Sequence, residues 1–245
     1  MTTVIKLGGS LLDDPQRRDA ALRKIVARWN AGEDIVLVHG GGKHIDAALA
    51  EKGIAKKTHA GLRITDDATL AIVVSVLGGT VNKMLVSELT KLGVRAAGLS
   101  GYDGGTLIAA QHPAIDGVEL GHVGKVTHAN RALVSAMLTY GTMPVVSSIA
   151  IGNDGALFNV NADSAAAAMA VALGAKELLF ITDVPGLLDA DGNVVPRLHA
   201  ADVETFIANV TGGMKPKLQA ALSALTTGVR EIVIGEEGGT TLVAA

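Results

Sequence analysis

The sequence predicts an α/β protein with parallel strands, and three observations lead to this prediction. A short apolar run, a glycine cluster and a helical pattern follow one another twice near the N-terminus, which is typical of parallel strands joined by crossover helices. Hydrophobic residues make up 49% of the 245 residues but aromatic residues only 2%, so aliphatic side chains must form the core. No proline- or serine-rich linker divides the chain, so we expect two lobes that share one continuous sheet.

The first half of the chain consists of strand–glycine–helix units. Glycines directly follow the first two apolar runs, and apolar residues at helical spacing follow each glycine cluster. A third apolar run leads into a glycine-rich stretch at residues 100–105. The elements expected here are strands at residues 4–7, 35–38 and 94–99 and helices at residues 16–29 and 44–52.

The second half continues this alternation after one exception. Residues 106–126 contain short runs separated by Pro113, Gly117 and Gly121, which predicts a hairpin appended to the main sheet. The elements expected after it are helices at residues 130–140, 163–173 and 214–227 and strands at residues 144–147, 177–181 and 231–234.

Composition excludes several classes of function. The formal net charge is -3 without long charged runs, so we expect no nucleic-acid or membrane partner. The absence of cysteine excludes disulfides, thiolate metal sites and a cysteine nucleophile, and the scattered histidines predict no metal site. The N-terminus has no apolar signal core, and we expect no run near the roughly 18 apolar residues that span a bilayer. A cytoplasmic protein with small-molecule partners is therefore expected.

Two glycine clusters lie where strands are expected to end. Ligands of open α/β sheets bind beyond the carboxyl ends of the strands, and glycine lets backbone N–H groups converge on phosphate oxygens. Gly8 and Gly9, and then Gly41 and Gly42, are therefore candidates for phosphate binding. The alternative is that these glycines only turn the chain tightly. The second cluster is not a Walker A motif, because His44 replaces the Ser or Thr that would contact Mg²⁺.

Four charged residues are candidates for the same site. Lys6 interrupts an apolar strand, and Lys217 lies near a predicted helix start, where a cation opposes the helix dipole unless an anion is bound. Asp163 either caps the following helix or, with the alternating polar residues at 159 and 161, points toward the strand ends. Arg63 suits a bidentate contact with a carboxylate or is an ordinary surface charge.

Taken together and in order, five segments resemble the acetylglutamate kinases of the amino-acid kinase family. The segments are Lys6-Leu7-Gly8-Gly9-Ser10, Val38-His39-Gly40-Gly41-Gly42, Gly61-Leu62-Arg63, Asn159-Val160-Asn161-Ala162-Asp163 and Gly213-Met214-Lys215-Pro216-Lys217. Further matches at residues 120–124, 145–149 and 182–187 extend the resemblance over nearly the whole chain.

The resemblance implies a three-layer αβα sandwich on a mainly parallel sheet, formed by one kinase domain at residues 1–245. Residues up to about 150 would form an N-lobe for the acyl-amino acid and for dimerisation, and residues 151–245 a C-lobe for ATP. The implied reaction moves the γ-phosphoryl group of ATP, bound with Mg²⁺, to the γ-carboxylate of N-acetyl-L-glutamate in arginine biosynthesis. Because a carboxylate is ionised at neutral pH, this reaction needs positioning and charge stabilisation rather than a catalytic base.

The resemblance also implies a role for each candidate residue. Lys6, Lys217 and Asp163 would be catalytic, with the two lysines flanking the transferred phosphoryl group and Asp163 orienting both. The glycines at 8, 9, 41 and 42 would bind phosphoryl oxygens, and those at 41 and 42 also the acceptor. The acceptor would also be bound by Arg63, Asn159 and Asn161. The nucleotide would be bound by Asp183 and by both lysines.

Two alternatives stay open, together with an expectation about assembly. The chain is either a kinase of a related acceptor, such as carrier-protein-linked aminoadipate or glutamate, or a non-catalytic nucleotide sensor. Because the first strand starts at residue 4, we expect no N-terminal helix of the kind that links family dimers into hexamers. A homodimer insensitive to arginine is therefore expected.

Overall fold

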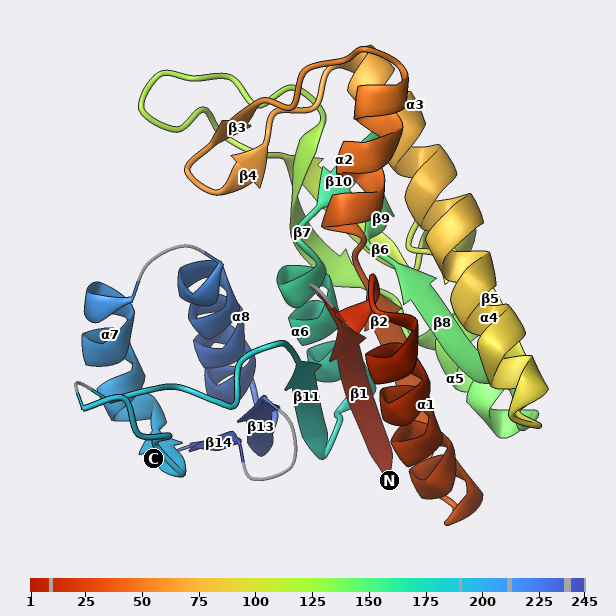
Figure 1. The fold of residues 1–245 in the computed structure, drawn as a ribbon, viewed down its shortest axis with the longest axis vertical. Helices are drawn as coiled ribbons and strands as arrows, with labels where there is room; N and C mark the ends of the chain where they lie inside the picture. The colour runs from red at the N-terminus through yellow and green to blue at the C-terminus, as the bar shows by residue number, and fades with distance from the viewer. Residues whose placement is uncertain (9–10, 190, 211–212, 236–238, 245) are drawn as a thin grey trace.

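An eight-stranded sheet runs through the molecule and carries strands from both halves of the chain (Figure 1). Its strands are β1 (Thr2–Leu7), β2 (Asp34–His39), β5 (Ala96–Ser100), β8 (Met143–Ser147), β11 (Glu177–Ile181), β12 (Arg197–His199), β13 (Glu231–Ile234) and β14 (Thr240–Val243). Their order is β12-β14-β13-β11-β1-β2-β8-β5, and only β13 and β14 pair antiparallel. This computed structural model describes residues 1–8, 11–189, 191–210, 213–235 and 239–244. The expected mainly parallel, shared sheet is confirmed.

Helices cover both faces of the sheet. They are α1 (Pro15–Asn30), α2 (Gly42–Glu51), α3 (Asp67–Val74), the π-helix η2 (Ser75–Val81), α4 (Asn82–Lys91), α5 (Ala132–Thr139), α6 (Ala162–Leu173), α7 (Ala200–Asn209) and α8 (Met214–Thr226), with a 3-10 turn at Asp103–Gly105. Successive strand residues point to opposite faces. Ile5 and Leu7 belong to the buried cluster that includes residues of α1, α2 and α4, whereas Val4 belongs to the cluster that includes residues of α6 and α8. This arrangement confirms the three-layer αβα sandwich.

A small closed barrel lies beside the main sheet and corrects one prediction. Its strands are β6 (Leu107–Gln111), β7 (Val123–Ala129), β9 (Ile149–Ile151) and β10 (Leu157–Val160). The predicted hairpin exists, since β6 and β7 pair antiparallel, but its attachment to the main sheet was wrong. The barrel pairs β6 with β9 and β7 with β10, so these edges are satisfied without the main sheet. A separate two-stranded pair, β3 (Thr58–His59) and β4 (Leu62–Arg63), lies before α3.

The first helix begins where its local sequence dictates and is fixed to a second helix. The carboxylate of Asp14 accepts hydrogen bonds from two backbone N–H groups of the first turn, and a proline occupies the first helical position. Further along α1, the buried guanidinium of Arg18 forms two hydrogen bonds of 2.8 Å with the carboxylate of Glu88 in α4. These contacts position the layer of helices that covers β1 and β2.

One long helix was not predicted. Asp67–Lys91 forms a continuous helix of 25 residues that runs along one side of the molecule (Figure 1). By length and composition alone this helix resembles a membrane span, as the apolar core helix of a folded domain also can. Val73 and Leu85 are nevertheless fully buried in the core. Two central glycines and an apolar character on most sides concealed the helical period.

Candidate active site

A buried carboxylate pairs with two ammonium groups at the centre of the molecule. The side chain of Asp163, in the first turn of α6, lies 2.8 Å from Nζ of Lys6 and 3.0 Å from Nζ of Lys217, through the same oxygen, Oδ1. The three residues are 6%, 8% and 5% exposed, respectively. Lys6 lies on the same face of β1 as Val4, toward α6, and Lys217 lies in α8, which packs on α6. The structure therefore brings together the three residues predicted to be catalytic.

The cluster holds one more positive than negative charge. Burial alone would raise the pKa of Asp163, but the ammonium groups of Lys6 and Lys217 outweigh burial and lower this pKa. The pKa of Lys217 is lowered by burial and by Lys6, while Asp163 partly offsets both effects. The ring of Phe180, with its centroid 5.1 Å from Nζ of Lys217, adds a cation–π contact. A buried excess of positive charge favours the binding of an anion here.

A cavity of about 410 Å³ opens beside this cluster and contains most of the predicted site. The predicted residues that line it are Lys6, Gly8, Gly41, Gly42, Arg63, Asn159, Asn161 and Asp163. A side chain would crowd its neighbours at two of these positions. A Cβ on Gly8 would collide with the side chain of Lys6, and a Cβ on Gly41 would lie 2.8 Å from Cδ2 of Leu77 in the π-helix. Both glycines let charged and apolar side chains approach the loops closely.

A buried histidine fixes the second glycine loop. Nδ1 of His39 donates to the carbonyl oxygen of Gly40 at 2.9 Å, and Nε2 accepts from the amide of Asn82 at 3.1 Å. Burial lowers the pKa of His39 to about 4, so the ring is neutral at pH 7 and both nitrogens are satisfied. Asn82 also donates to the carbonyl oxygen of Val145 in β8. This pair was not predicted from the sequence, because the two residues are 43 positions apart.

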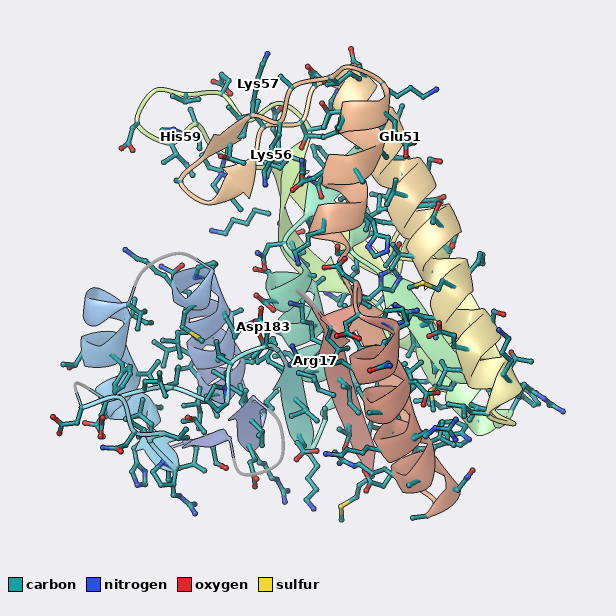
Figure 2. All side chains as sticks on the ribbon, in the orientation of Figure 1. Arg17, Glu51, Lys56, Lys57, His59 and Asp183 are labelled. Atoms are coloured by element: carbon teal, nitrogen blue, oxygen red, sulfur yellow. The ribbon has the colours of Figure 1, made fainter. Side chains whose placement is uncertain are left out.

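Three residues that line the cavity form ion pairs that were not predicted. The carboxylate of Asp46 in α2 accepts from Nη2 of Arg63 through Oδ1 and from Nζ of Lys56, at 2.9 Å, through Oδ2. Nη1 of Arg63 is buried and has no partner among the residues that the structure describes. Asp46 lies one helical turn after Gly42, and this spacing was the available signal. Figure 2 labels Lys56 in the segment before β3.

The polar run at residues 159–163 differs from its prediction. Of its three polar residues only Asn159 lies in a strand, and its amide donates to Oγ1 of Thr65 at 3.1 Å. Asn161 is the N-cap of α6 and accepts from the backbone N–H groups of Asp163 and Ser164. The cap is therefore Asn161, not Asp163, because the helix begins at residue 162. The carboxylate of Asp163 remains available to the lysines.

Three predicted residues, Lys217, Asp183 and Gly9, are absent from the cavity lining or from the described chain; Lys217 does not line the cavity but contacts it through Asp163. Asp183, labelled in Figure 2, is exposed in the segment after β11 and accepts from Oγ1 of Thr182 at 3.0 Å. It does not line the cavity, but its charge acts on Lys217. Gly9 lies outside the described residues.

Comparison with known proteins finds relatives that all point to one family. Residues 1–236 match the model of the amino acid kinase family. The acetylglutamate kinase of Granulibacter bethesdensis is 41% identical over 244 residues, covering 95% of this chain and 82% of the relative. That of Methanopyrus kandleri is 44% identical over 239 residues, covering 94% and 93%. The crystal structure of smu.665 from Streptococcus mutans UA159 has a TM-score of 0.88 at 31% identity and covers 99% of this chain and 98% of that chain.

Proposed function

The chain belongs to the amino acid kinase family, and from this membership we propose that it phosphorylates the γ-carboxylate of N-acetyl-L-glutamate with ATP. The product is N-acetyl-L-glutamyl 5-phosphate, an intermediate of arginine biosynthesis. The observation that carries the proposal is the pairing of Asp163 with Lys6 and Lys217 beside the cavity, in a chain more than 40% identical to acetylglutamate kinases.

Each residue of the cluster has a role in this reaction. Phosphoryl transfer to a carboxylate brings two anions together, so it is accelerated by fixed cations that stabilise charge in the transition state. We assign Lys6 to the acceptor side of the phosphoryl group and Lys217 to the leaving ADP. Asp163 holds both ammonium groups, and Gly8, Gly41 and Gly42 donate backbone N–H groups to phosphoryl oxygens. Asp183 is assigned to the nucleotide because it follows β11 near Lys217.

The charges of the cavity favour an acylated acceptor. Among the described lining residues the only carboxylates are Asp46 and Asp163, and each is paired with two cations. The α-ammonium of free glutamate would find no available counter-ion, whereas an acetylated nitrogen carries no charge. Since burying an unpaired charge costs several kcal/mol, we expect L-glutamate to have a kcat/KM at least about 100-fold lower than its N-acetyl derivative. Arg63 and Asn159 are assigned to the acceptor's α-substituents, and Asn161 to the adjoining wall.

Mg²⁺ is proposed to accompany ATP. In the part of the chain that the structure describes, no three His, Cys, Asp or Glu side chains gather to hold a metal ion. We therefore expect the magnesium ion to be held mainly by phosphate oxygens and water, as is common at nucleotide sites. When bound, the ion neutralises phosphate charge.

The lobes and the assembly form part of the same proposal. We assign acceptor binding and dimerisation to residues 1–150 and ATP binding to residues 151–245, in a cytoplasmic homodimer insensitive to arginine. In the helix Asp67–Lys91, only 39% of the most apolar 18-residue stretch is buried. Ala71 and Ser75 are exposed on the outer face of this helix. A second copy of the chain would pack closely on this face of small side chains. Light scattering should give twice the 24.9 kDa chain mass, and Ala71→Arg should give the monomer.

A direct assay tests the reaction. The purified protein is incubated with Mg-ATP and N-acetyl-L-glutamate, L-glutamate, L-aspartate, N-acetyl-aminoadipate or no acceptor, and acyl phosphate is trapped with hydroxylamine. Hydroxamate formed preferentially with N-acetyl-L-glutamate supports the proposal. Preference for another acceptor, or ATP binding without turnover, would instead favour a kinase of a related, carrier-linked acceptor or a nucleotide sensor.

A further inference from the structure

Asp46 holds Arg63 in an arrangement that leaves half of its guanidinium group available. Oδ1 of Asp46 accepts from Nη2 of Arg63, and the carbonyl oxygen of Gly42 accepts from the same nitrogen at 3.3 Å. Oδ2 of Asp46 is occupied by Nζ of Lys56 at 2.9 Å, so the carboxylate does not form the usual two-pronged pair with the guanidinium. Nη1 of Arg63 is left buried, without a partner in the described part of the chain, and its side chain lines the cavity.

The two residues are supported very differently by the fold. Asp46 is part of α2, which is anchored in the core by Ile45 and Leu49. Arg63 belongs to the two-residue strand β4, whose only described strand partner is the equally short β3. A long side chain on such a small hairpin loses considerable rotamer entropy when it is fixed. The orientation of Arg63 therefore depends on contacts with α2 rather than on its own strand.

From this geometry we infer that Asp46 is a positioning residue, which orients Arg63 so that Nη1 binds the α-carboxylate of the acceptor. The inference rests on the proposed function for the identity of the acceptor. Lys56 contributes by occupying the second carboxylate oxygen, which keeps Nη1 free for the ligand. Burial would raise the pKa of Asp46, but hydrogen bonds from Lys56 and Arg63 outweigh it and lower this pKa, so Asp46 is ionised at neutral pH.

Steady-state kinetics of the full chain test whether Asp46 acts through Arg63. Asp46→Asn should raise the KM for N-acetyl-L-glutamate about 10- to 30-fold, leaving kcat and the KM for ATP within about threefold, because binding rather than chemistry is impaired. In an Arg63→Ala background the same substitution should change the acceptor KM by less than about twofold. The control Asp19→Asn removes a carboxylate from an exposed pair with Arg23 and should change none of these values.

A second measurement does not depend on the reaction. In protein labelled with ¹⁵N-arginine, the Nη protons of Arg63, assigned by their loss in Arg63→Lys, should be resolved because rotation of the group is restricted. In Asp46→Asn they should merge into averaged signals. If the wild-type protein does not phosphorylate N-acetyl-L-glutamate, the proposed function fails, and the spectra alone decide whether Asp46 positions Arg63. Unchanged spectra, an unchanged acceptor KM in an active Asp46→Asn variant, or additive effects in the double variant would overturn the inference.

Discussion

Replacing Asp163 by asparagine removes the negative charge that two buried ammonium groups share. At an effective dielectric constant of about 20, two unit charges about 3 Å apart interact by about 5–6 kcal/mol, and Asp163 forms two such pairs. Desolvation offsets much of this energy, and removing one partner of a buried ion pair typically costs about 3–5 kcal/mol. We expect Asp163→Asn to lower the free energy of unfolding by about this amount. The positions of Lys6 and Lys217 would be lost with it.

The catalytic consequence follows from the same geometry. Without Asp163, the two ammonium groups repel each other, and the pKa of Lys217, which is already lowered, should fall further. We expect kcat to fall by about 10²–10³-fold, as when one preorganised electrostatic contact is lost from a transition state.

Two assays at pH 7 check this prediction: urea unfolding followed by circular dichroism, and hydroxamate formation with both substrates saturating. Asp19→Asn is the matched surface control. A kcat within about threefold of the wild type, in a variant destabilised by less than about 1 kcal/mol, would refute the electrostatic role given to Asp163.

Three further predictions concern single groups. Lys6→Ala and Lys217→Ala should each lower kcat by about 10²-fold, far more than they raise either KM, and an unchanged kcat in steady-state assays would contradict the assigned role. The pKa of His39 is about 4, against 6.5 when unfolded, so between these values the unfolded chain binds a proton that the folded chain does not. The free energy of unfolding should therefore fall by about 2–3 kcal/mol from pH 6.5 to pH 4.5 through this residue, and His39→Gln should flatten the slope measured by urea unfolding. Arg18→Met should lower this free energy at pH 7 by about 2 kcal/mol without altering kcat, because its contact with Glu88 joins α1 to α4 away from the cavity; an unshifted urea midpoint would contradict this.

The sequence predicted those strands and site residues whose signal lies within a few neighbouring residues. The strands at 177–181 and 231–234 were predicted with their observed bounds, because buried aliphatic residues and flanking turns mark them clearly. Lys6 was recognised as a candidate because a lysine in a buried strand needs an anionic partner. Its partner Asp163 was a candidate for an independent reason, and the resemblance to a family then assigned both to one catalytic cluster.

Features that depend on distant contacts were not predictable in the same way. The barrel needs β7 and β10 to pair in parallel, and neither strand carries a signal for its partner. The contact of Asp46 with Arg63 spans 17 positions and depends on where the β3–β4 hairpin folds back. Strands as short as β12 and β14 are too short to show a periodicity of their own. Tertiary packing determines all of these.

The long apolar helix has a consequence for synthesis of the protein. Asp67–Lys91 leaves the ribosome well before β8, the strand that supplies Val145 to the core around Leu85. About 50 residues separate the helix from that strand, so at roughly 5–20 residues per second the nascent chain presents an uncovered apolar segment for several seconds. During this interval we expect chaperones to bind the segment. A nascent chain arrested between these two elements should therefore be the form most dependent on chaperones.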